Sequence, residues 1–121
     1  MTEGDALDFL RHSLGSVWAL ELLVLVGSDP ARSWRIEELV HESRSSVAAM
    51  TGAALLLERA GLVVNSGAQE YRYQPSSPNL DAIAERVRKL YAAKPTTVIA
   101  AIFEPRNERL REFAQAFKFK E

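Results

Sequence analysis

The stretch from Trp34 to Pro75 constrains the fold of this 121-residue chain more than any other part of it. It contains two helical patterns, SWRIEELVHE and SSVAAMTGAALLLERAGL, which a few small polar residues join. Two short strand patterns follow near residues 62–65 and 70–74, with Gly67 between them. Two such runs around a glycine predict a β-hairpin. The predicted order is therefore helix, tight turn, second helix and hairpin.

This order is the layout of the winged helix-turn-helix, which usually presents its second helix to the major groove of DNA. Prolines mark where further helices begin or end, because proline suits the first helical turn and not the interior. We predict helices near residues 5–13, 17–27, 36–42, 47–60, 79–93, 96–103 and 107–117. The expected fold is mainly α with a small β-hairpin, a winged helix-turn-helix with additional C-terminal helices.

The composition fits one compact domain, since 47% of the residues are hydrophobic and glycines and prolines are few. We divide it into N-terminal helices (1–30), the winged helix-turn-helix (31–75) and a C-terminal helical extension (76–121), which is a candidate dimerisation region. No window approaches the roughly 18 to 20 apolar residues of a membrane span. There is no cysteine. We expect a cytoplasmic protein with no membrane contact and no cofactor.

The helix near residues 17–27 is apolar almost all round, which is typical of a helix packed on several sides. We expect it in the middle of the core, with Trp18 as a core aromatic residue and Ser16 as its N-cap.

Charge is unevenly distributed along the chain, although the net charge is only −1. Residues 1–30 carry one basic and five acidic side chains, and residues 31–78 carry five arginines and five glutamates. Residues 79–121 carry nine basic and six acidic side chains. Any cationic surface is therefore expected mostly outside the part of the chain that would touch DNA.

The candidate recognition helix has a clear inward and a clear outward face. A rotation of about 100° per residue directs one set of residues towards the core: Met50, Ala53, Ala54 and Leu57. The same rotation directs a second set outward: Ala48, Thr51, Gly52, Leu55 and Arg59. Helices that read bases usually carry Arg, Asn, Gln or Lys there, whereas this face is largely uncharged.

Several residues around this helix remain candidates for DNA contact. Thr51 could touch a thymine methyl group or a phosphate, and Arg44, Ser45 and the N-cap Ser46 could contact backbone phosphates. Gly52 either permits close backbone approach or is simply tolerated.

The predicted wing has an uncharged tip. Residues 65–69 carry no arginine or lysine, and Arg72 is the only cation of the wing. Arg72 is therefore a candidate for a phosphate contact, with a surface ion pair as the alternative. Tyr71 and Tyr73 alternate with polar residues and are expected to pack inward.

The run LVHESRSSVAAMTGAALLLERAGLVVNSGAQEYRYQP resembles winged-helix regulators of the MarR type. The resemblance includes the joint between helix and wing, Leu57 to Val63, and its specific part is the Ala-Gly-Leu-Val of Ala60 to Val63. The match covers about a third of the chain. The resemblance implies a dimeric repressor or activator that binds double-stranded DNA. It also implies recognition-helix residues near Ser45, Ser46, Ala48, Thr51 and Gly52.

Beyond Pro75 the chain carries more apolar material than a minimal winged helix needs. Ser77 is the expected N-cap of the next helix, with Pro78 at its first position. The later helices carry apolar side chains that either close the core or form a two-fold dimer face: Ile99, Ile102, Phe103, Phe113 and Phe117.

An enzyme is not expected. His12 and His41 lack metal-ligand spacing, and the sequence has no phosphate-binding glycine loop or nucleophile motif. Two functional classes remain open. The first is a small transcription regulator that binds DNA as a homodimer. The second is an adaptor that binds another protein, through Ala48, Thr51 and Leu55 or through the helical tail. The layout favours DNA and the neutral charge favours the adaptor.

Overall fold

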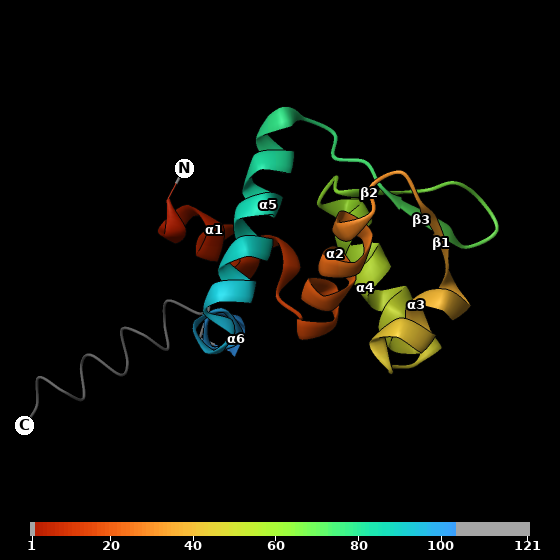
Figure 1. Ribbon diagram of the computed structural model, residues 1–121, viewed down its shortest axis with the longest axis horizontal. Helices are drawn as coiled ribbons and strands as arrows, with labels where there is room; N and C mark the ends of the chain where they lie inside the picture. Colours follow the sequence, from red (N-terminus) through yellow and green to blue (C-terminus); the bar gives the residue numbers. More distant parts are fainter. Residues whose placement is uncertain (1, 104–121) are drawn as a thin grey trace, which may run out of the picture.

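The computed structural model describes residues 2–103, which form a mainly helical fold with a small antiparallel sheet (Figure 1). The elements in chain order are α1 (Glu3–Phe9), the π-helical turn η1 (Leu10–Leu14), α2 (Val17–Ser28), β1 (Ser33–Arg35), α3 (Ile36–Ser43), α4 (Val47–Arg59), β2 (Val63–Asn65), β3 (Glu70–Tyr73), α5 (Pro78–Ala93) and α6 (Pro95–Phe103). The helix predicted near 107–117 lies outside the described residues.

The sheet has three strands in the order β1-β3-β2, so the predicted hairpin gains a third strand. Trp34 of β1 lies opposite Tyr71 of β3, and Val63 of β2 lies opposite Tyr73. All four side chains are buried, which confirms that both tyrosines pack inward. The sequence did not reveal β1, because three residues are too few to show the alternation that identifies a strand.

Helix α2 lies between α5 and the winged part of the molecule in Figure 1, and it packs against α4, α5 and β3. Ser16 caps it, since its Oγ accepts a hydrogen bond from the Ala19 amide at 3.4 Å. The expectation for Trp18 was wrong, because its side chain is 41% exposed. A helix that is apolar all round does not show from sequence which side faces outward, and here Ala19 and Leu20 take the inward positions.

The turn between α3 and α4 is short and well defined. Arg44 ends α3 in the left-handed conformation with φ of 54°, and the Ser45 amide donates to the Val40 carbonyl at 3.2 Å. The Ser46 Oγ then caps α4 by accepting from the Ala49 amide at 3.1 Å. As predicted, α4 buries one face: Met50, Ala53, Ala54 and Leu57.

The helices after the wing pack onto the first ones. Ser77 caps α5 by accepting from the Leu80 amide at 3.2 Å, and Pro78 is the first helical residue, as predicted. Helix α5 contacts α1, α2 and α6. Among the described residues, no single helix is long and apolar enough to cross a membrane. Glu3–Leu14 and Val17–Ser28 meet that criterion only when taken together, as a pair bent by 111°.

Candidate nucleic-acid interface

The outward side of α4 carries small and apolar side chains. We define the outer face of α4 by five exposed residues: Val47, Ala48, Thr51, Gly52 and Leu55. Val47 is 55% exposed and Leu55 is 45% exposed. Sequence reasoning missed Val47, although its position four residues before Thr51 places both on the same side of a helix. The face contains no ionisable group.

The residues of the turn before α4 differ in exposure and in hydrogen bonding. Arg44 is exposed, and so is Ser46 at the N-cap. Ser45 is half-buried, and its hydroxyl lies 2.6 Å from the Ser43 Oγ, which itself donates to the Leu39 carbonyl at 2.7 Å. The Ser45 hydroxyl therefore stabilises the turn. Arg44 and Ser46 are the more exposed residues of the turn.

The N-terminus of α4 is electrostatically positive. Helix α4 is 13 residues long and has no acidic residue in its first turn. Unpaired amides and the helix dipole give such a terminus a partial positive charge that favours anions. The carboxylates in the first turn of α3, by contrast, offset that charge at α3.

The wing ends in a polar, exposed turn. The Asn65 Oδ1 accepts from the Gly67 amide at 2.9 Å, and Gly67 has a φ of 97° that suits glycine. Arg72 lies on the exposed side of β3, opposite the buried tyrosines, and donates to the Gln74 Oε1 at 2.6 Å. Its guanidinium is therefore at the surface with a neutral partner.

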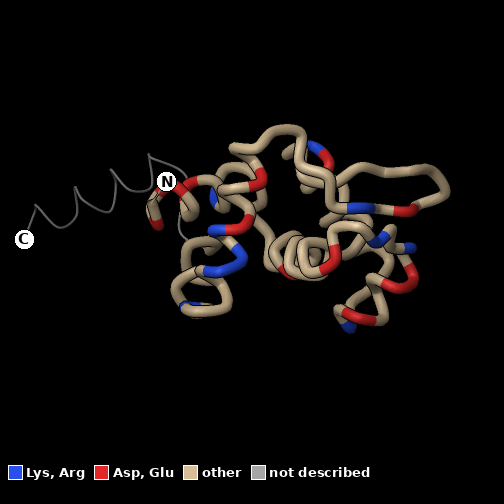
Figure 2. The backbone as a smooth tube through the Cα atoms, turned by 45° about the horizontal axis from the view of Figure 1, so that its top comes forward, with Lys and Arg blue, Asp and Glu red and all other residues tan. Residues whose placement is uncertain are grey.

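Both acidic and basic residues lie in the winged part of the molecule, as the red and blue segments of Figure 2 show. Arg32 pairs with Glu38 at 2.8 Å, and Arg35 lies 3.8 Å from Glu37. The Arg35 amide, and then Arg32, lower the pKa of Glu38 below its ordinary value. Two of the five arginines of residues 31–78, Arg32 and Arg35, are thus paired with carboxylates.

The candidate dimerisation residues are placed differently from one another. Phe103 at the end of α6 is 73% exposed, and Ile99 is half-buried. Ile102 is only 6% exposed, because it packs with Val98 and Ala101 into the core of the same chain. Phe113 and Phe117 lie outside the described residues.

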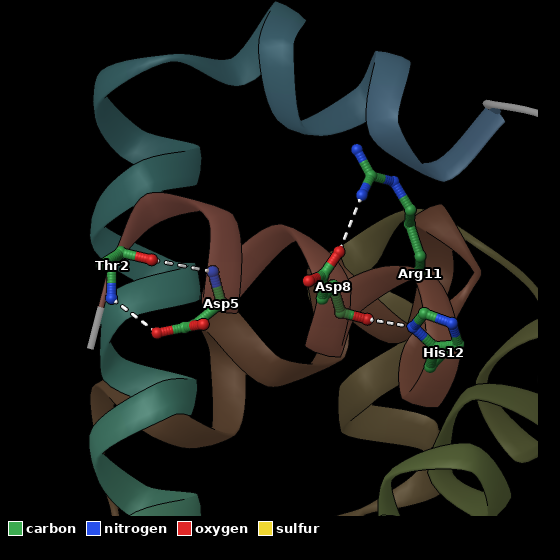
Figure 3. A network of polar contacts seen from close by, with 5 residues as sticks. All are labelled: Thr2, Asp5, Asp8, Arg11 and His12. Atoms are coloured by element: carbon green, nitrogen blue, oxygen red, sulfur yellow. Dashed lines mark hydrogen bonds and ion pairs between the residues drawn. The ribbon is translucent and has the colours of Figure 1, made fainter.

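A groove of about 600 Å³ lies between α1 and α5, and both polar and apolar residues line it: Asp5, Asp8, Phe9, Asn79, Leu80 and Ile83. Figure 3 shows that both of its carboxylates are already engaged. Asp5 accepts from the Thr2 amide at 2.9 Å, which together with the Thr2 side chain lowers the Asp5 pKa.

Asp8 pairs with Arg11 at 3.0 Å, and its carbonyl lies 2.8 Å from the His12 Nδ1. These contacts stabilise α1 and η1 locally. No group of three or more His, Asp or Glu side chains in residues 2–103 is placed to hold a metal ion.

Similarity to known proteins was found in the fold and not in the sequence. No protein-family model matches the chain, and no curated protein matches its sequence. Among solved structures, the crystal structure of a MarR family protein of Mycobacterium tuberculosis superimposes with a TM-score of 0.54 at 18% identity. The match covers 95% of this chain and 84% of that chain. The fold predicted from the sequence is confirmed, and this chain has a MarR-like winged-helix fold.

Proposed function

We propose that this protein is a small DNA-binding transcription regulator that acts in the cytoplasm as a homodimer. The observation that carries the proposal is the exposed outer face of α4, which follows a tight turn and precedes the wing. In winged helix-turn-helix proteins, the helix in this position enters the major groove. The resemblance of the fold to a MarR family protein supports the same assignment.

The contacts expected at α4 come mainly from its first turns. The free amides of the N-terminus, the Ser46 hydroxyl and the Arg44 guanidinium would bind backbone phosphates. Thr51 would meet a thymine methyl group or a phosphate in the groove. Arg72 would bind a phosphate from the wing side.

Gly52 suits a close approach of DNA to the backbone of α4. Apart from the adjoining residues and the backbone of α4 itself, a Cβ added there would have no described atom within 4 Å, so packing inside the protein does not require glycine. Glycine in a helix interior costs about 1 kcal/mol relative to alanine. Close contact with a nucleic acid would give this position a function that offsets the cost.

The small number of cations determines the expected salt dependence of DNA binding. Arg44 and Arg72 from each chain of a dimer would give about four ionic phosphate contacts, so log K should fall against log salt with a slope of roughly −4. A two-fold dimer would present one α4 helix to each of two major grooves about 34 Å apart. Exposed Phe103 and half-buried Ile99 are the described candidates for the dimer contact, with Phe113 and Phe117 added from the sequence.

The test is fluorescence anisotropy with random and genomic double-stranded DNA at about 50 to 300 mM salt. The Arg44→Ala variant should bind more weakly and with a flatter salt dependence. Arg86→Ala is the matched control, because Arg86 is an exposed arginine on α5. Equal affinities and slopes for wild type and Arg44→Ala would remove Arg44 from the interface.

A second function is favoured by one observation, the exposure of Val47 and Leu55 on the outer face of α4. Exposed apolar side chains in a contiguous set are typical of protein contacts, so the alternative is an adaptor that binds another protein. Leu55→Glu should then leave the fold intact and abolish that complex, whereas Ala82→Glu on α5 should not. A complex that survives Leu55→Glu would exclude this face as the contact.

A further inference from the structure

Tyr73, the last residue of β3, contacts two residues of α5. The Tyr73 hydroxyl donates to the Asp81 Oδ1 at 2.7 Å, and the Arg88 Cζ lies 5.4 Å from the centre of the Tyr73 ring. Asp81 and Arg88 are seven residues apart, which places them on the same side of α5. The Tyr73 side chain is buried, and this burial, followed by the bond to Asp81, raises the Tyr73 pKa above its ordinary value.

Arg88 also reaches a third element. Its Nη1 donates to the Gly27 carbonyl at 2.7 Å, in the last turn of α2. A cation at the C-terminus of a helix interacts favourably with the helix dipole. Arg88 therefore links three elements, since it belongs to α5, donates to the end of α2 and lies near the ring of Tyr73 in β3.

Gly27 provides the space for this contact. A Cβ at position 27 would lie 2.8 Å from the Cδ and Cζ atoms of Arg88, and closer still to Nη1. Any larger residue there would displace the guanidinium. Gly27 does not have a positive φ, so the backbone conformation does not require glycine. The close approach of Arg88 is therefore the structural reason for a glycine inside α2.

From this geometry we infer that Arg88 is a positioning residue, which clamps the wing strand β3 and the end of α2 to α5. The clamp consists of Arg88, Gly27, Tyr73 and Asp81. It fixes the orientation of α4 and the wing relative to α5, although none of its members belongs to the outer face of α4. The effect of the clamp on DNA binding rests on the proposed function. In a dimer joined through the last helices, the clamp would set the distance between the two α4 helices.

The experiment uses the full chain and the variants Gly27→Ala, Arg88→Ala and Gly27→Ala/Arg88→Ala, with Arg86→Ala as the control. The first readout is hydrogen exchange at the Gln74 amide, which follows Tyr73 and donates to the Leu62 carbonyl at 2.9 Å. Gly27→Ala and Arg88→Ala should each accelerate this exchange about fivefold or more, because the wing opens locally more often. Arg86→Ala should leave it unchanged.

The double variant separates the clamp from a general loss of stability. If Gly27→Ala acts by displacing Arg88, it should have no further effect once Arg88 is alanine, so the two effects should not add. Additive effects would overturn the clamp, and so would wild-type exchange at Gln74 in Gly27→Ala.

The second readout is DNA affinity as a function of half-site spacing. Gly27→Ala should lower affinity for the best spacing about tenfold and broaden the spacing preference, because two half-sites can no longer be engaged together as well. Faster exchange with wild-type affinity and spacing would overturn the positioning role. If wild type binds no DNA, the proposed function fails, and the exchange data still decide whether the clamp exists.

Discussion

Replacing Gly52 by alanine should change stability and DNA affinity in opposite directions. The added methyl group would lie in open space on the outer face of α4, since only the adjoining residues and the backbone of α4 itself come within 4 Å of it. Alanine favours a helix interior over glycine by about 0.5 to 1 kcal/mol, so the free protein should become more stable by this amount. For a domain of this size, that corresponds to a rise in Tm of roughly 2 to 4 °C.

DNA binding should weaken in the same variant, because the methyl group would occupy the space that the proposed close approach needs. The assay combines thermal denaturation of the free protein with anisotropy on DNA. Gly67→Ala is the control for glycine replacement in general: Gly67 has a φ of 97°, so alanine there should destabilise the fold. A Gly52→Ala protein that is less stable than wild type would refute the reasoning from helix propensity, and unchanged affinity would refute the close approach.

Three further results are expected. Arg44→Ala should reduce the salt slope of a dimer by about two, as titration of binding against salt will show, while Arg86→Ala keeps the wild-type slope. Ser46→Ala should lower the free energy of unfolding by about 1 kcal/mol in urea denaturation, because it removes the N-cap of α4. An unchanged free energy of unfolding would mean that the Ser46 hydroxyl does not stabilise α4. A hydrogen bond to Glu21, and then burial, raise the pKa of Tyr91 to about 12. The raised pKa stabilises the fold below about pH 10, and this contribution should be lost as pH rises towards 12. Tyr91→Phe should remove that part of the pH dependence.

Helix periodicity explains most of what the sequence predicted correctly. The spacing of Met50, Ala53, Ala54 and Leu57 identified the buried face of α4, and hydroxyl residues before helical patterns identified the caps Ser46 and Ser77. These are local properties, in which each residue's place follows from its neighbours in the chain. The same reasoning failed at Trp18, where the pattern was apolar on every side and so carried no direction.

Features that depend on distant residues were not visible in the sequence. Strand β1 is identified by its pairing with β3, nearly forty positions later, rather than by its own three residues. Arg88 and Gly27 are separated by 61 positions, and no local pattern links them. Ser45 belongs to the predicted site by position, but its hydroxyl turns towards Ser43. Phe113 and Phe117 remain predictions for the dimer contact.

The central claim is that the outer face of α4 binds DNA as part of a dimer. The most direct measurement is anisotropy of the wild-type protein with double-stranded DNA over a range of salt, with its mass measured by light scattering in the same buffer. The account predicts a particle of two chains whose affinity falls with salt with a slope of roughly −4. A protein that binds no DNA even at the lowest salt would contradict it, and would favour the adaptor.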